Sequence, residues 1–238
     1  MAFGSTFEEI ASKKTHPEKI QTKYGYFVNA VNEHEFSLKQ YFFKQGYNGR
    51  PNIPQGILFV ESGKIIIKTD DSKEDLVIEK GYSITLPKGF IFELTVESDS
   101  IVYVFSSQNY NPDFSTPKPT FNNLEKYWGE IKNIASNEHL AAKLILKNAN
   151  SQSSLEYHVS KKEAYIVQSG KIKVGLRVGR AENKSITLEQ GDVFVIPQGA
   201  MHMRIGIEDS VIIEISTKDD DKDSKLVEDG KTYVHREV

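Results

Sequence analysis

The chain has 238 residues, a length that suits one large β domain or two domains of about 100 to 120 residues each. Hydrophobic residues make up 38% of it and charged residues 26%, which is ordinary for a globular protein and excludes the disordered class. The net charge of −3 gives no reason to expect nucleic acid or an anionic membrane as a partner, and the absence of cysteine excludes disulfides, thiolate metal sites and a cysteine nucleophile.

The N-terminal residues lack the apolar segment of a signal peptide, and no run approaches the roughly 18 apolar residues of a membrane-spanning helix. We therefore expect a cytoplasmic protein.

Short β-branched and aromatic runs, broken by Gly, Pro, Asp and Ser, predict strands through most of the chain. In chain order these runs are 56–70, 82–96, 99–107, 141–148, 155–159, 164–179, 192–199, 202–207 and 210–217. Two weaker patterns suggest short helices at 7–13 and 122–134. Residues 108–123 are rich in Pro, Asn and Ser without hydrophobic periodicity, which is typical of a linker.

The chain contains an internal repeat. Residues 56–68 (GILFVESGKIIIK) recur as 163–175 (EAYIVQSGKIKVG), and a Gly, Pro and Gly at 81, 87 and 89 recur 110 positions later. The pair Tyr24-Gly25 recurs as Trp128-Gly129. The same order at a nearly constant offset indicates duplication of one β unit.

The second unit carries two spaced motifs, whose polar members are Glu156, His158, Glu163 and His202. On a strand, residues two apart share a face, so Glu156 and His158 point the same way, and the turns before Glu163 and His202 can bring both back beside them. Two imidazoles and two carboxylates leave one or two coordination positions open for Zn, Mn, Fe, Co or Ni. We therefore predict one divalent metal ion per chain.

These motifs, with Gly170, Gly191, Pro197 and Gly199 in place, resemble those of the cupin superfamily, which usually has His where this chain has Glu156. The resemblance implies an all-β bicupin of two tandem jelly-roll barrels with short peripheral helices. The expected boundaries are an N-terminal extension at 1–20, a cupin without ligands at 21–107, a linker at 108–123, a metal-binding cupin at 124–217 and an acidic, solvated tail at 218–238.

The first unit is expected to hold no metal. Carrying the four ligand positions back by the repeat offset leads to Gly49, Pro51, Gly56 and Phe92, none of which is a metal ligand. The first barrel is therefore predicted to be structural.

Further residues are candidates for the pocket. Strand alternation places Arg204 on the face of His202, where it could bind a phosphate or carboxylate, or simply pair with Glu156. Tyr165 shares the inward face of Glu163, as a proton carrier or a barrel-lining ring. Lys143 is a catalytic candidate, with a solvated face as the alternative, and Arg177 and Arg180 could rim the opening or lie on the surface.

A narrower resemblance is to the sugar-phosphate-isomerase branch of cupins, including phosphomannose isomerases. It rests on Gln152, Ser154, Leu155, His158 and the pair Trp128-Gly129. It implies a phosphorylated sugar as substrate, Gln152 in substrate binding, isomerisation through an enediol, and a possible homodimer. A sugar-binding protein without catalysis and a metal-dependent dioxygenase are the alternatives.

Overall fold

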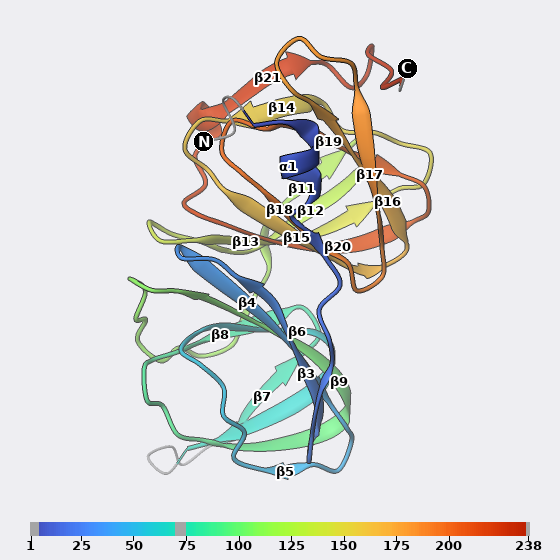
Figure 1. The fold of residues 1–238 in the computed structure, drawn as a ribbon. Helices are drawn as coiled ribbons and strands as arrows, with labels where there is room; N and C mark the ends of the chain where they lie inside the picture. Colours follow the sequence, from blue (N-terminus) through green and yellow to red (C-terminus); the bar gives the residue numbers. More distant parts are fainter. Residues whose placement is uncertain (1–4, 70–74, 237–238) are drawn as a thin grey trace. The chain divides into compact units, whose positions relative to one another are not determined.

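The computed structural model describes residues 5–69 and 75–236, which are almost entirely β (Figure 1). The chain divides into two compact units. One consists of residues 17–121, and the other of residues 122–238 with the N-terminal residues up to His16. No helix among the described residues is long and apolar enough to cross a membrane.

The C-terminal unit consists of two sheets. The seven-stranded sheet has the order β1 (Lys14–Thr15), β18 (Val193–Ile196), β15 (Glu163–Ser169), β20 (Ser210–Ser216), β13 (Ala141–Lys147), β12 (Gly129–Ser136) and β11 (Phe121–Lys126). The five-stranded sheet has the order β17 (Lys184–Glu189), β16 (Lys171–Arg177), β19 (Met201–Gly206), β14 (Leu155–His158) and β21 (Ser224–Glu228). One apolar core, which includes Ile145, Val174, Leu188, Phe194 and Ile212, joins strands of both sheets.

The N-terminal unit has one nine-stranded sheet. Its order is β10 (Lys118–Pro119), β8 (Tyr82–Leu86), β6 (Gly56–Lys68), β9 (Glu93–Ser107), β4 (Phe36–Phe43), β3 (Gly25–Asn32) and β2 (Ile20–Thr22), with β5 (Asn48–Gly49) on β9 and β7 (Leu76–Glu79) on β6. Its core is rich in aromatic rings, among them Tyr24, Tyr41, Phe43 and Phe92.

The sequence repeat has a structural counterpart. The order β10-β8-β6-β9-β4-β3-β2 is matched, strand for strand, by β1-β18-β15-β20-β13-β12-β11. A β-bulge between Asn29 and Val31 recurs between Asn133 and Ala135. Gly63 and Gly170 both have φ near +80°, and a Cβ on either would come within 2.4 Å of the strand opposite. A side chain is therefore excluded at this turn in both units.

Two short helices were predicted, and one of them is confirmed. Helix α1 (Phe7–Ala11) begins with a capping box between Thr6 and Glu9. The helix predicted at 122–134 is wrong, because these residues form β11 and much of β12. Gly129, with a φ of +144°, starts a strand that pairs with β13 along its length, and this pairing outweighs a weak helical pattern.

The segments predicted to lie outside the barrels contain short strands and one aromatic contact. In the predicted linker, Phe114 stacks on Phe90 with ring centroids 4.4 Å apart, and residues up to Phe121 belong to the N-terminal unit. The predicted N-terminal extension adds β1 to the edge of β18. The tail expected to be solvated contains β21, which pairs with β14.

Candidate metal centre

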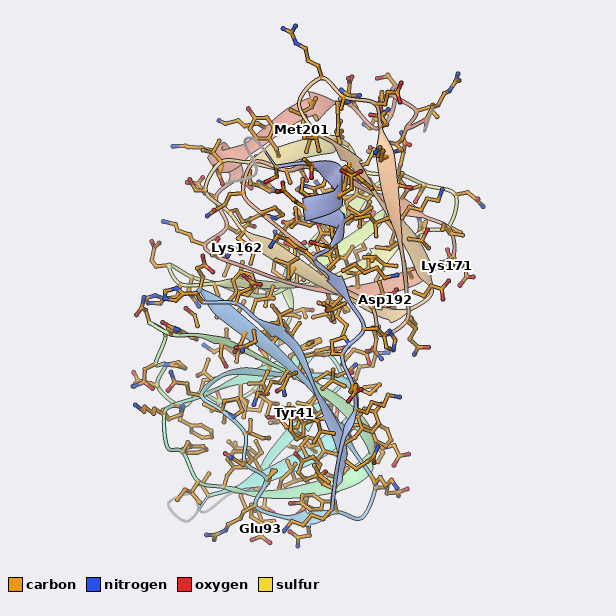
Figure 2. All side chains as sticks on the ribbon, viewed as in Figure 1. Tyr41, Glu93, Lys162, Lys171, Asp192 and Met201 are labelled. Atoms are coloured by element: carbon orange, nitrogen blue, oxygen red, sulfur yellow. The ribbon has the colours of Figure 1, made fainter. Side chains whose placement is uncertain are left out.

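Strands β14, β15 and β19 bring the predicted ligands together. Glu156 on β14 pairs directly with His202 on β19, next to Met201, which is labelled in Figure 2. One ligand atom each from Glu156, His158 and His202 lies within 4.8 Å of the others, and no other such group of three occurs among the described residues. His158 and His202 are 6% and 2% exposed. Three of the four predicted ligands therefore form one group.

The two imidazoles carry buried nitrogens without hydrogen bonds. The Nδ1 atom of His202 lies 2.9 Å from the carbonyl oxygen of Ala200, an acceptor only, so Nδ1 carries the proton. The Nε2 atom of His202 and the Nδ1 atom of His158 are buried and have no hydrogen-bond partner. A buried polar atom without a partner is costly unless something binds it. One nitrogen of each imidazole lies within 4.8 Å of a Glu156 oxygen, and this set of donors fits a divalent metal ion.

The fourth predicted ligand, Glu163, lies beside this group. Its Oε1 atom accepts a hydrogen bond of 2.5 Å from the Tyr165 hydroxyl and lies 2.7 Å from Nε2 of His202. Its Oε2 atom lies 2.8 Å from Nζ of Lys161. Burial alone would raise the pKa of Glu163, but the Lys161 ammonium and the imidazoles hold this pKa well below its usual value. Glu163 is therefore an anion at neutral pH.

A buried network of charges surrounds Glu163. Arg204 donates from Nη1 to the Tyr165 hydroxyl at 2.9 Å and to Oε2 of Glu214 at 3.3 Å, and its Nη2 lies 4.0 Å from Glu156. Arg204 thus points inward, as predicted, and pairs with Glu156 only at the limit of contact. Burial raises the pKa of Tyr165 well above its ordinary value, so this hydroxyl stays protonated.

Lys143 also points into the unit. Its Nζ atom lies 2.6 Å from Asp219 and 3.5 Å from Glu214. The alternative of a solvated face at Lys143 is wrong, because its side chain is only 13% exposed and pairs with the buried Glu214 and the partly buried Asp219.

Gln152 and Arg177 are not brought to the metal group. The Gln152 amide donates to the carbonyl oxygens of Gly230 and Tyr233. Arg177 donates to Glu228 at 2.9 Å and to the Tyr233 hydroxyl at 3.1 Å. Both side chains hold the C-terminal segment in place, and substrate binding by Gln152 stays a prediction.

Sequence reasoning missed four residues that shape this centre, namely Lys161, Glu214, Asp219 and Ser224. Ser224 donates a 2.5 Å hydrogen bond to Oε2 of Glu156. Glu214 had a detectable signal, since it is the single acidic residue in the apolar run VIIEIS. Ser224 had none, because its place depends on the pairing of β21 with β14.

The comparison with known families settles the fold. Residues 114–236, just over half of the chain, match the family described as Cupin. The chain belongs to the cupin family. No curated protein matches its sequence.

Solved structures of Bacillus subtilis oxalate decarboxylase resemble this cupin. One variant of that enzyme is 12% identical, covers 90% of this chain and 79% of its own, and has a TM-score of 0.70. A second structure, from work on the Mn(II) centres of the same enzyme, is 12% identical over 90% and 79% of the two chains, with a TM-score of 0.69. A third variant is 14% identical over the same shares, with a TM-score of 0.68. At such identities the likeness concerns the fold alone.

The N-terminal unit has no comparable group among residues 17–69 and 75–121. Strand pairing also corrects two of its predicted equivalents. Asn48 pairs with Thr95 in the first unit, and Gln152 pairs with Ile205 in the second, which makes Asn48 and Gln152 equivalent. The offset between equivalent residues before β14 is therefore 104 and not 107. Glu156 and His158 then correspond to Asn52 and Pro54 rather than to Gly49 and Pro51.

The other two predicted equivalents agree with the pairing. Gly56 pairs with Leu86 as Glu163 pairs with Ile196, which supports the equivalence of Gly56 and Glu163. Phe92 keeps the position of His202, and its ring lies in the apolar core of the N-terminal unit.

Proposed function

We propose that the C-terminal unit is a mononuclear metal centre that binds a small anionic substrate. Glu156, His158 and His202 hold one divalent ion, and Glu163, the fourth predicted ligand, stands next to them. The observation that carries this proposal is the grouping of one ligand atom each from Glu156, His158 and His202 within 4.8 Å of one another, with the buried Nε2 atom of His202 lacking a hydrogen-bond partner among the described residues. Three protein ligands leave coordination positions open for substrate.

The charge of the centre indicates the substrate class. Four carboxylates (Glu156, Glu163, Glu214 and Asp219) stand against three cations (Lys143, Lys161 and Arg204). The cluster therefore carries one net negative charge, and a divalent ion changes it to one net positive charge. A monoanion such as a carboxylate neutralises this charge, whereas a phosphate dianion exceeds it.

Arg204 offers the substrate a donor. Its Nε atom is buried and has no hydrogen-bond partner, while Nη1 is committed to Tyr165 and Glu214. A carboxylate oxygen on Nε would satisfy this donor with a charge-assisted hydrogen bond. The Tyr165 hydroxyl donates its one hydrogen to Glu163 and accepts from Arg204, and because it stays protonated it cannot serve as a base.

A bound divalent ion would act as a Lewis acid on a substrate oxygen. The chain itself supplies orientation through Arg204 and a buried surround that excludes water. The structurally similar enzyme is named for oxalate, which is a small carboxylate. A small carboxylate is thus preferred here over the sugar phosphate that the narrower resemblance implies.

We further infer that the chain consists of two tandem cupin barrels, of which the first is structural. The matching strand orders and the matched bulges support this arrangement. Elemental analysis then gives one metal ion per chain, and two tightly bound ions would contradict it. The homodimer expected on family grounds remains a prediction for light scattering.

The test combines metal analysis with ligand screening. The wild-type chain binds Mn²⁺, and the double variant His158→Ala/His202→Ala binds none; full occupancy in that variant refutes the centre. Glycolate, a monoanion, raises the Tm of the metal-loaded chain, but not that of the chelated chain. Stabilisation by mannose 6-phosphate alone would instead favour the isomerase. Oxygen consumption with bound iron would favour a dioxygenase, and stabilisation without turnover a sugar-binding or acid-binding protein.

A further inference from the structure

Lys161 is a buried cation to which the proposed function gives no role. Its side chain is 5% exposed, and its Nζ atom lies 2.8 Å from Glu163, 3.2 Å from Asp219 and 3.7 Å from Glu214. The shortest of these contacts is to Oε2 of Glu163, the carboxylate that stands next to the metal-binding group. Lys161 therefore occupies one of the two oxygens that Glu163 could offer to a metal ion.

The other oxygen of Glu163 is engaged as well. The Tyr165 hydroxyl donates to Oε1 at 2.5 Å. A divalent ion that binds Glu163 must therefore share the carboxylate with a buried ammonium group. Like charges repel strongly where little water screens them. Binding of the ion and the Lys161–Glu163 ion pair oppose each other.

The backbone holds Lys161 in this position. The carboxylate of Asp223 accepts hydrogen bonds from the N–H groups of Val159, Ser160 and Lys161, at 2.8 to 3.1 Å. These bonds fix the turn between β14 and β15, from which the lysine side chain extends. They hold the Cα atom of Lys161 in place, from which its side chain reaches Glu163.

We propose that Lys161 is a positioning residue that competes with the metal ion for the Glu163 carboxylate and so weakens metal binding. The inference rests on the proposed metal centre, because it assumes that Glu156, His158 and His202 bind an ion. Removing the ammonium group frees Glu163 as an additional ligand. The ion is then bound more tightly.

The chain offers a matched control. Lys143 belongs to the same network and carries the same charge, but it contacts Asp219 and Glu214 and not Glu163. Lys143→Met removes one positive charge from the cluster and leaves the Lys161–Glu163 pair intact. A difference between the two methionine variants therefore reports the contact with Glu163 and not the loss of a charge.

The experiment is a calorimetric titration of the chelated full-length chain with Mn²⁺. We expect Lys161→Met, or Lys161→Gln where the methionine variant does not fold, to bind Mn²⁺ at least tenfold more tightly than the wild type. Lys161→Arg, which keeps the ion pair, and Lys143→Met should stay within threefold of it. Electron paramagnetic resonance of the bound Mn²⁺ should change in Lys161→Met, because one more carboxylate coordinates the ion.

The double variant Lys161→Met/Glu163→Gln has neither the competitor nor the carboxylate, and should bind no more tightly than the wild type. Unchanged or weaker binding in both neutral Lys161 variants overturns the inference, and so does a tenfold gain that persists in the double variant. Absence of Mn²⁺ binding in every variant overturns the metal centre itself.

Discussion

The Nε2 atom of His202 lies 2.7 Å from Oε1 of Glu163, and yet these two buried atoms are not aligned as a hydrogen bond. The Nδ1 atom of this imidazole donates to the carbonyl oxygen of Ala200, so in the neutral ring Nε2 presents a lone pair and not a hydrogen. A lone pair beside a carboxylate is unfavourable unless a cation lies between or next to them. A metal ion bound to Nε2 would satisfy both atoms.

The Lys161–Glu163 ion pair should stabilise the metal-free protein. Glu163→Gln leaves the buried ammonium group next to a neutral amide, with Asp219 and Glu214 as remaining partners, and we expect a loss of about 2 to 3 kcal/mol in the free energy of unfolding. Urea denaturation of the chelated protein measures it. The neutral pair in Lys161→Met/Glu163→Gln should recover most of the loss, and a strictly additive double variant would contradict the ion pair.

The hydrogen bond from Ser224 to Glu156 should support metal binding. Ser224 lies on β21, and its hydrogen bond orients the carboxylate of Glu156. Removal of such a contact to a metal ligand typically lowers the affinity for the metal ion by about 10- to 100-fold. We expect Ser224→Ala to weaken Mn²⁺ binding about tenfold in a calorimetric titration. Ser154→Ala is the matched control, because Ser154 accepts from the N–H of Gly230 in the same C-terminal segment but does not contact Glu156. Equal effects in the two variants would assign the loss to the segment and not to the hydrogen bond.

The part of the site that sequence could predict depends on local geometry. Glu156 and His158 alternate on one strand, and His202 follows a Pro-x-Gly turn, so short-range rules were enough to bring them together. The inward orientation of Arg204 followed from the same alternation, two residues after His202.

The rest depends on contacts between distant segments. Ser224 reaches Glu156 because β21 pairs with β14 across an irregular register, and residues 218–223 show no apolar periodicity that predicts packing. A solvated face stayed open as the alternative for Lys143, because its partners, Glu214 and Asp219, lie about 70 residues further along the chain. Gly49 and Pro51 were assigned with an offset of 107 between the two units. The offset is 104 before β14 and 107 at β15, because the second unit has three extra residues between these two places.

Asp192 should hold the N-terminal segment to the C-terminal unit. Lys14 lies 2.8 Å from one oxygen of its carboxylate, and Nδ1 of His16 lies 2.9 Å from the other. Burial acts to raise the pKa of Asp192, but these bonds and the N–H of Glu189 lower it below the ordinary value of 3.8. Because the folded-state pKa is depressed, the stabilisation is complete above about pH 4 and is lost as the pH falls through the folded value.

Asp192→Asn should therefore release β1. We expect amide hydrogens of residues 14–16 to exchange about tenfold faster at neutral pH, which corresponds to about 1.4 kcal/mol of local stability. Asp209→Asn serves as the control, since Asp209 accepts from the N–H of Ala149 at a different turn. Unchanged exchange at β1 in Asp192→Asn would show that the strand pairing alone fixes this segment.

Lys147 should make the protein more stable at mildly alkaline pH. It is 1% exposed and has no acidic partner among residues 5–69 and 75–236; its Nζ atom donates to the hydroxyl of Ser151 and the carbonyl oxygen of Trp128. Burial, with a contribution from Arg204, lowers the pKa of Lys147 to about 7 from an ordinary value of 10.5. Between these two values the unfolded chain binds the proton more strongly, so unfolding becomes less favourable as the pH rises.

We expect the free energy of unfolding to increase by roughly 1 to 2 kcal/mol between pH 7 and pH 9, as measured by urea denaturation at each pH. Lys147→Met should abolish most of this increase and be more stable than the wild type at pH 7, because it removes a cation that must be buried or neutralised. Lys143→Met should keep the pH dependence, since Lys143 is paired with two acids. An identical rise from pH 7 to pH 9 in Lys147→Met would show that another group titrates and that Lys147 stays charged in the folded protein.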